Sequence, residues 1–568
     1  MLNFIDHKVG IAVVVMAAIV WFAFLGHRDL FEEDEGRYAE IPREMVASGD
    51  WLTPRLDGFK YFEKPAFQYW ITAAGYKLFG ENNATARLWP AVFGFVCALF
   101  IGYLGGRLFN RDAGFYGFII TISSLMFVTL GHFLTLDMTV SAFMMIGIGA
   151  FAIAQNNRRD RACVRNWMLI AWAALAGAVL TKGLVGLVLP GAAVVVYGLW
   201  QRDSALWKHM HLFKGMLLLL ILTVPWFWAV SDANAEFARF FFIHEHFERY
   251  LSTVHKRAGS ILYFVPVFIL GISPWLVSGL GAVLKPDLSW RSDPAEGFNP
   301  KRFFWVYIVV TFVFFSIGES KLPAYILPIM PVVALLAGNR LANKPIVKGD
   351  AWTLLIIAGL CLLLGAGITR FANGNVTVED LQRYRLWVMP AGLILFAGAF
   401  ALFRAESHPG RNFAIAGISV LCAFQMILLG YQELERSRSS ADIARAIREN
   451  NLVDAPIYSV DRDYPQSLPF YIGKTITLVG YRGELSMGID AEPDKWLATP
   501  QQFQQRWLTD TQAVAVLDDN GYQRYKAMGL PMRIIYQAPG KIVVAKTGRN
   551  REMNTYRAAV GIPAGGYD

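Results

Sequence analysis

The sequence is poor in charged residues and in cysteine. Charged side chains make up 17% of its 568 residues, against about 25% in soluble proteins. Hydrophobic residues reach 55%, so most of the chain is expected to lie in a lipid bilayer. The 4 cysteines form no CxxC pair, which excludes a disulfide framework and a cysteine-ligated metal site.

The formal net charge of +9 raises the question of nucleic-acid binding. The sequence has no basic stripe, recognition-helix pattern or RNA-binding motif. Lys and Arg instead gather in short segments between apolar runs, as the positive-inside rule predicts for membrane proteins. We therefore expect no nucleic acid among the partners.

Long apolar runs continue to about residue 431. A membrane span needs about 20 mostly apolar residues, and about thirteen such runs are present. They begin near residues 8, 86, 113, 137, 166, 183, 213, 259, 303, 323, 351, 386 and 411. The first run is followed by bulky residues instead of a small-residue cleavage site, which indicates an uncleaved anchor. The pattern predicts an all-α polytopic membrane domain over residues 1–431.

The basic loops give the expected topology. Arginines cluster between residues 158 and 165, after the fourth run, and the loops after runs two, six, eight and ten also carry Arg or Lys. These loops fall on one side, which is predicted to be cytoplasmic together with the N-terminus. The periplasmic side then receives the loops 27–85 and 231–258 and everything after about residue 431.

From residue 432 the composition becomes that of a soluble protein. A helix-like stretch at 440–450 is followed by strand-like runs at 456–460, 513–517, 533–536 and 542–545. This order predicts a small periplasmic α/β domain over residues 432–568, ending in a flexible glycine-rich tail.

The loop after the first run mixes both signs of charge with aromatic residues, in the segments 34–38, DEGRY, and 61–65, YFEKP. A solvated loop beside an interfacial aromatic belt would explain the composition. Residues 38–46, however, place Tyr38, Ile41 and Met45 on one helical face, which predicts a helix along the membrane surface. The loop is therefore a candidate site at the lipid boundary.

Ionisable residues recur at the predicted ends of other spans. They are Asp137, Lys182, His244, His246, Arg249, Glu319 and Lys321. Such residues are costly at membrane depth unless they are paired or hydrated, so each is a candidate for function. Snorkelling or structural pairing explains any one of them equally well, but their common side favours a shared site.

Three segments, 34–38, 61–65 and 320–328 (SKLPAYILP), resemble those of the lipid A aminoarabinose transferases. These are GT-C glycosyltransferases related to the protein O-mannosyltransferases. The resemblance implies a GT-C membrane domain in the bacterial inner membrane. It also implies transfer of 4-amino-4-deoxy-L-arabinose from undecaprenyl phosphate to a lipid A phosphate at the periplasmic face, which confers resistance to polymyxin and cationic peptides. The partners would be this donor, lipid A and membrane lipids.

In this reaction negative charge grows on the leaving phosphate and positive charge on the sugar ring. We predict that Lys64 and Arg249 bind the carrier phosphate, assisted by Lys182 or Arg37, and that Asp34 stabilises the sugar. An acceptor phosphate has a second pKa near 6 and needs little general-base help. A direct displacement would invert the anomeric centre.

The other predicted site residues bind substrate or metal. The substrate-binding set is completed by Tyr38, Tyr61, Asp137, Glu319, Lys321 and Tyr325. Glu63, also placed in the catalytic set, could bind a divalent ion with His244 or His246, since imidazole and carboxylate suit zinc or manganese. Pairing of Glu63 with Lys64 is the alternative.

Two other classes of protein have such spans, a transporter of lipid-linked sugars and a membrane scaffold. A transporter would place ionisable residues near the bilayer midplane, whereas here they gather at one face. Among transferases, the remaining alternative is a GT-C enzyme that moves another polyprenyl-phosphate-linked sugar, or that transfers it to a different lipid or to a protein.

Overall fold

The computed structural model describes residues 7–248, 259–286, 297–344, 347–373, 376–434, 438–460 and 464–547. The chain divides into two compact units. The helical unit comprises Met1–Arg28, Phe62–Phe371 and Val378–Leu434. The α/β unit comprises Asp29–Tyr61, Ala372–Thr377 and Glu435–Asp568. The charged segment that follows the first apolar run is thus grouped with the C-terminal residues.

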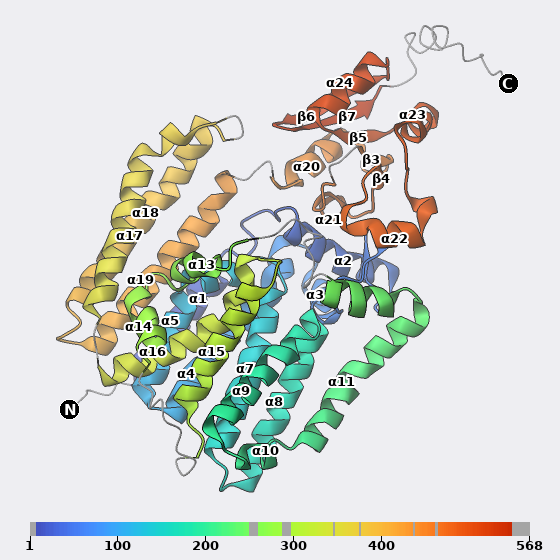
Figure 1. Cartoon of the computed structure of the whole chain (residues 1–568). Coiled ribbons are helices and arrows are strands. Elements are labelled where there is room, and N and C mark those ends of the chain that lie inside the picture. Colours follow the sequence, from blue (N-terminus) through green and yellow to red (C-terminus); the bar gives the residue numbers. More distant parts are fainter. Residues whose placement is uncertain are drawn as a thin grey trace, which may run out of the picture. The chain divides into compact units, whose positions relative to one another are not determined.

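The helical unit contains long apolar helices, and each predicted apolar run corresponds to a helix or to a pair of short ones (Figure 1). Its helices are α1 (His7–Phe22), α3 (Phe67–Phe79), α4 (Asn83–Leu108), α5 (Arg111–Ser123), α6 (Leu125–Gly131), α7 (Asp137–Asn156), α8 (Arg161–Lys182), α9 (Val185–Gln201), α10 (Ala205–Lys208), α11 (Leu212–Ala233), η1 (Arg239–Glu248), α13 (Phe264–Ile272), α14 (Leu276–Leu284), α15 (Pro300–Ile317), η3 (Pro323–Ile329), α16 (Met330–Asn343), α17 (Lys348–Gly367), η4 (Ile368–Phe371), α18 (Val378–Phe403), α19 (Pro409–Gly430) and η5 (Tyr431–Glu433).

In the described part of the chain, 9 helices are long and apolar enough to cross a membrane. The pair α5 and α6 adds one more if it forms a single span bent by 62°. The apolar segments Val9–Phe22 and Val185–Gln201 are shorter. These helices confirm the predicted polytopic α-helical membrane domain.

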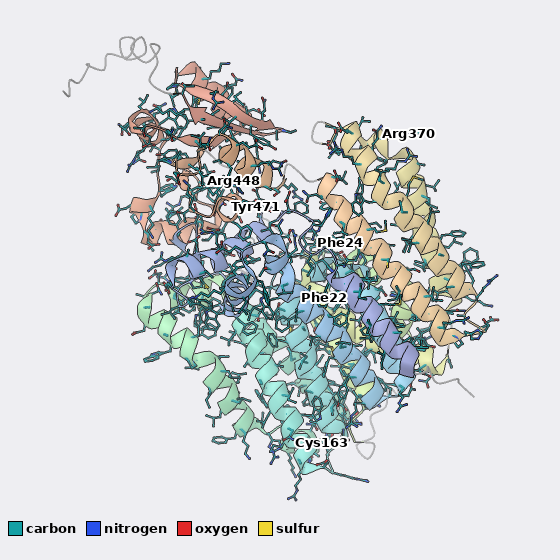
Figure 2. The ribbon with its side chains drawn as sticks, turned by 180° about the vertical axis from the view of Figure 1, so that it is seen from behind. Phe22, Phe24, Cys163, Arg370, Arg448 and Tyr471 are labelled. Carbon is teal, nitrogen blue, oxygen red and sulfur yellow. The ribbon has the colours of Figure 1, made fainter. Side chains whose placement is uncertain are left out.

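Close packing within the helical unit relies on glycine. A Cβ atom at Gly114 in α5 would lie 2.2 Å from the carbonyl oxygen of Gly102 in α4, so the two backbones can touch only where side chains are missing. Farther along the chain, α17, α18 and α19 lie side by side at one edge of this unit (Figure 1). Cys163 lies at one tip of the unit, near the start of α8 (Figure 2).

The α/β unit is built around a five-stranded sheet of order β4-β3-β5-β7-β6. Strands β3, β4 and β5 are parallel, whereas β7 is antiparallel to both β5 and β6. The elements of this unit are α2 (Asp34–Ser48), β1 (Arg55–Leu56), β2 (Phe59–Lys60), α20 (Ala441–Glu449), β3 (Ile457–Val460), α21 (Leu468–Ile472), β4 (Thr477–Val479), η7 (Gly483–Leu485), α22 (Ser486–Ala491), η8 (Pro493–Lys495), α23 (Pro500–Thr509), β5 (Val514–Leu517), α24 (Asp519–Ala527), β6 (Met532–Ala538) and β7 (Lys541–Lys546).

The four strands predicted in the C-terminal region are confirmed as β3, β5, β6 and β7. Strand β3 is buried along its whole length, as expected for a parallel strand covered on both faces. Hydrogen bonds from side chains join helices of this unit to one another. Arg448 of α20, for example, donates from Nη2 to the carbonyl oxygen of Tyr471 in α21 at 2.9 Å (Figure 2). This ties the end of α20 to α21.

Candidate functional site

An acidic and a basic side chain meet where α7 begins and α8 ends. Lys182 Nζ donates a hydrogen bond to Asp137 Oδ1 in an ion pair. The two side chains are 19% and 17% exposed, respectively, so solvent still reaches the pair. Lys182 Nζ also lies 5.2 Å from the centre of the Tyr325 ring, within the range of a cation–π contact. The structure thus brings three predicted site residues together.

The YFEKP segment leads into α3 beside the same end of α7. Lys64 Nζ donates to the carbonyl oxygen of Glu63 at 2.9 Å and lies 3.7 Å from its Oε2 atom. Farther along, Thr139 Oγ1 of α7 donates to Gln68 Oε1 of α3 at 2.7 Å. Because Thr139 lies two residues after Asp137, this bond fixes the start of α3 against the start of α7. Lys64 and Lys182 therefore belong to neighbouring helix ends of the helical unit.

Lys321 is buried beside the C-terminal end of α15. Its Nζ atom donates to the carbonyl oxygens of Ser316 at 2.8 Å and Gly318 at 2.7 Å. A buried lysine placed there satisfies the last carbonyl groups of α15. Its charge orders the turn before η3, the helix that carries Tyr325. Glu319, by contrast, is exposed.

In the α/β unit, Arg37 is enclosed by protein groups. It donates from Nη1 to Tyr61 Oη at 3.0 Å and from Nε to Gln466 Oε1 at 3.2 Å. Its Nη2 atom lies 3.7 Å from Glu484 and 3.8 Å from Asp34. The Asp34 side chain is 61% exposed. These contacts support a positioning role for Arg37 and leave Asp34 accessible.

At Gly36, in the DEGRY segment, the backbone of α2 passes very close to the backbone of residues 466–467. A Cβ atom at this position would lie 2.5 Å from the backbone nitrogen of Ser467 and 2.7 Å from the carbonyl carbon of Gln466. Only glycine lets α2 approach the 466–467 backbone so closely. This approach brings Gln466 within reach of Arg37.

The predicted helix at residues 38–46 exists as part of α2, but it is not an amphipathic surface helix. Every residue from Glu35 to Met45 is buried within the protein, including the polar Glu40, Arg43 and Glu44. Tyr38 and the aliphatic face therefore pack against protein. The apolar face of this helix was expected to contact lipid and is covered by protein instead. The same apolar spacing suits a face buried in protein as well as a face in contact with lipid.

The α/β unit contains a buried carboxylate cluster that was not predicted from the sequence. Glu40 accepts two hydrogen bonds from Arg43, at 2.5 Å and 2.6 Å. Glu44 accepts one from the backbone nitrogen of Gly58 at 2.9 Å, and Asp57 accepts one from that of Ile476 at 2.7 Å. Burial and the neighbouring Asp57 carboxylate raise the pKa of Glu44 to about 7. Burial also raises the pKa of Asp57 well above its usual value.

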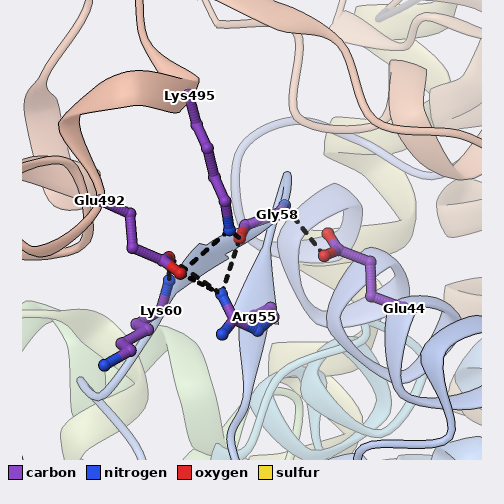
Figure 3. Close-up of polar contacts among 6 residues, drawn as sticks. All are labelled: Glu44, Arg55, Gly58, Lys60, Glu492 and Lys495. Carbon is purple, nitrogen blue, oxygen red and sulfur yellow. Dashed lines mark hydrogen bonds and ion pairs between the residues drawn. The ribbon is translucent and has the colours of Figure 1, made fainter.

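One carboxylate of the cluster, Asp57, lies in a hairpin that was not predicted either. Strands β1 and β2 are joined by Asp57 and Gly58, with φ of 53° and 79°, and Asp-Gly is a strong signal for a two-residue hairpin. The hairpin is anchored by Glu492, which accepts hydrogen bonds from Arg55 at 2.9 Å and Lys495 at 3.0 Å (Figure 3). The residues from Arg55 to Lys60 are therefore bound to the C-terminal segment by several polar contacts.

The metal prediction remains untested. Among the described residues, no group of three His, Cys, Asp or Glu side chains is placed to hold a metal ion. Glu63 pairs with Lys64, the alternative noted above. His244 lies in η1 but its side chain is outside the described set, and Arg249 lies outside the described residues altogether. Binding of a divalent ion by Glu63 and His244 stays a prediction.

Two family models match the chain. A model described as dolichyl-phosphate-mannose-protein mannosyltransferase covers residues 8–241, and one described as aminoarabinose transferase C-terminal domain covers residues 443–546. The arabinosyl transferase that uses undecaprenyl phosphate-alpha-4-amino-4-deoxy-L-arabinose in Shewanella sediminis is 29% identical over 86% of this chain and 89% of its own. The corresponding arabinosyl transferase of Edwardsiella ictaluri is 30% identical over 69% of this chain and 71% of its own.

A solved structure shares the whole architecture. The crystal structure of ArnT from Cupriavidus metallidurans bound to undecaprenyl phosphate has a TM-score of 0.87 and 35% sequence identity, and the match covers 94% of this chain and 98% of that one. The polytopic helical unit, with charged residues at its helix ends and a small α/β unit, therefore defines a multi-pass inner-membrane glycosyltransferase that uses a polyprenyl phosphate sugar donor. More specifically, the chain belongs to the family of undecaprenyl phosphate-aminoarabinose arabinosyl transferases.

Proposed function

We propose that the protein transfers 4-amino-4-deoxy-L-arabinose from undecaprenyl phosphate to a phosphate of lipid A, at the periplasmic face of the inner membrane. The observation that carries the proposal is the Lys182–Asp137 pair beside Tyr325, at an end of the apolar helices. A polyprenyl donor and an acylated acceptor stay in the bilayer, since each buried methylene contributes about 0.8 kcal/mol. Their phosphates therefore reach the protein at helix ends of this kind.

The chemistry requires cations that can exchange partners. As the bond from the sugar to the carrier phosphate breaks, negative charge grows on the phosphate. Lys182, assisted by Lys64, is proposed to bind that phosphate, because each pairs with a nearby carboxylate and keeps part of its side chain exposed. The acceptor phosphate is largely ionised near neutral pH and attacks directly, so the anomeric centre inverts.

The proposed orientation follows from the charge of the helix ends. Helices α7 and α8 are antiparallel, with Asp137 and Lys182 at one end and the arginines of residues 158–165 at the other. Basic loops favour the cytoplasmic side. The ends that carry Asp137 and Lys182 are therefore proposed to be periplasmic, as is the C-terminal part of the α/β unit.

Transfer by the purified, full-length protein in detergent tests the reaction. The donor would carry a labelled aminoarabinose, and lipid A and a Ser/Thr-rich peptide would be offered as separate acceptors. We expect label on lipid A only, with an inverted anomeric centre by NMR. Label on the peptide would favour the alternative acceptor. A lack of transfer in detergent, together with movement of the donor across sealed vesicles, would favour a transporter.

A further inference from the structure

A cavity with polar and apolar lining lies in the helical unit, away from the Lys182–Asp137 pair. It has a volume of about 430 Å³ and is formed by the ends of three helices, α14, α15 and α16. Lys301 stands at the start of α15, whereas Lys321 lies beyond its end. A helix of 18 residues is about 27 Å long at 1.5 Å per residue. The cavity is therefore at the end of α15 opposite to Lys321 and Tyr325.

Four cationic residues from these helix ends line the cavity. They are Lys285, Lys301, Arg340 and Lys344. No Asp or Glu is among the described residues that line it. Neither Lys285 nor Lys344 forms an ion pair within the described part of the chain. The cavity thus concentrates positive charge that the described lining does not neutralise.

Hydrogen bonds from Arg340 hold the wall of the cavity, and they do not involve the ammonium groups of Lys285 and Lys344. Arg340 Nη1 donates to the carbonyl oxygens of Gly281 at 3.2 Å and Lys285 at 2.9 Å. Arg340 therefore joins the end of α16 to the end of α14. A Cβ atom at residue 281 would lie 3.2 Å from Arg340 Nε, so a glycine leaves room for the guanidinium. The arginine is a fixed part of the wall.

The wall also has an apolar side. Trp305 donates from Nε1 to the carbonyl oxygen of Val283 at 3.0 Å, which fixes its indole ring, and Leu336 and Ala282 lie beside it in the lining. Indole rings favour the boundary between lipid headgroups and acyl chains. A site that combines several cations, an indole and aliphatic side chains matches a ligand with a phosphate and an attached acyl chain. A free phosphate ion would use only the cations.

We propose that this cavity binds the phosphate headgroup of an anionic phospholipid, from the leaflet that faces the Lys- and Arg-rich loops. Ligand cavities in proteins are commonly about 300–1,000 Å³, so a cavity of about 430 Å³ can hold a glycerophosphate headgroup. Basic pockets between membrane helices are known to bind such headgroups. Lys285 and Lys344 attract the phosphate through their charge, whereas Arg340 and Trp305 form the wall of the cavity.

The ordinary alternative is that these residues are part of the diffuse positive charge of one membrane face. Lys208, at the end of α10, and Lys214, in the first turn of α11, are exposed on that same face but do not line the cavity. The double variant Lys208→Gln/Lys214→Gln removes the same charge elsewhere. It is therefore a matched control for Lys285→Gln/Lys344→Gln.

The test is native mass spectrometry of the full-length protein, titrated with phosphatidylglycerol or phosphatidylcholine in detergent. We expect tighter binding of phosphatidylglycerol, and about five-fold weaker binding for each lysine removed from the cavity. The control variant and Lys285→Arg/Lys344→Arg should keep wild-type affinity.

Three results would overturn the proposal. One is equal binding of the two lipids by the wild-type protein. A second is an equal loss of phosphatidylglycerol binding in the control variant, which would indicate diffuse surface charge. The third is displacement of phosphatidylglycerol by sn-glycerol 3-phosphate at similar concentration, which would assign the cavity to a soluble phosphoester.

Discussion

Lys182, the last residue of α8, donates a hydrogen bond to Asp137, the first residue of α7. Each charge offsets part of the cost of removing the other from water. An incoming phosphate can take hydrogen bonds from the same ammonium group, because lysine has three donors. The pair can therefore bind a lipid phosphate without the two helix ends moving apart.

Lys182→Ala should lower kcat/KM for transfer by about ten- to a hundred-fold, the loss expected for one charge-assisted hydrogen bond. Lys182→Arg should retain part of the activity. The control is Lys208→Ala, which removes an exposed lysine of α10. Wild-type kcat/KM in Lys182→Ala would remove this lysine from the site.

Asp34→Asn should reduce transfer by at least about ten-fold, because a carboxylate would no longer stabilise positive charge on the sugar. Its melting temperature should not change, since the Asp34 side chain is 61% exposed. Glu33→Gln, a change at the exposed neighbouring position, should leave transfer unaffected. A well-folded Asp34→Asn protein with full activity would show that this carboxylate has no part in the reaction.

Gly36→Ala should destabilise the α/β unit by about 1–3 kcal/mol, because the added methyl group overlaps the backbone of Ser467. Thermal unfolding measures the effect. The matched control is Gly106→Ala in α4, where a Cβ atom meets nothing within 4 Å and alanine favours the helix. Equal melting temperatures for the two variants would contradict the close approach of α2 to residues 466–467.

The buried carboxylates predict how stability depends on pH. Burial and the nearby Asp57 raise the pKa of Glu44 from 4.5 to about 7. The folded protein therefore holds a proton that the unfolded chain releases. This contribution to stability is complete below about pH 4.5 and is lost as the pH rises through about 7.

Glu44→Gln should flatten the fall in melting temperature between about pH 5 and pH 8. The exposed Glu449→Gln should leave the slope as it is in the wild-type protein. A wild-type melting temperature that rises over this range, or a slope unchanged by Glu44→Gln, would contradict the raised pKa.

The sequence predicted the membrane helices well, because an apolar run of span length has few other structures available to it. The strands β3, β5, β6 and β7 were also predictable, being short β-branched runs between polar stretches. Strand β4, Thr477–Val479, was missed because three residues give too short a pattern. The Asp57-Gly58 hairpin carried a usable signal that was overlooked.

Contacts made by charged residues were harder to predict than the elements that carry them. Asp137 and Lys182 were identified separately from their positions at span ends, but only the antiparallel packing of α7 and α8 shows that they pair. The hydrogen bonds from Lys321 to the carbonyl groups of Ser316 and Gly318 were not predicted, and substrate binding by Lys321 stays a prediction. The burial of Arg37 depends on Tyr61, Gln466 and Glu484, which no local pattern connects.

Mass spectrometry of lipid A is the most direct test of aminoarabinose transfer to lipid A by this protein. Lipid A would be compared between cells with the gene, without it, and complemented by the wild-type or Lys182→Ala protein, after expression of the gene has been shown. We predict that deletion removes aminopentose from the lipid A phosphates and that only the wild-type protein fully restores it. Unchanged lipid A after deletion, in a strain that normally carries the modification, would contradict the account.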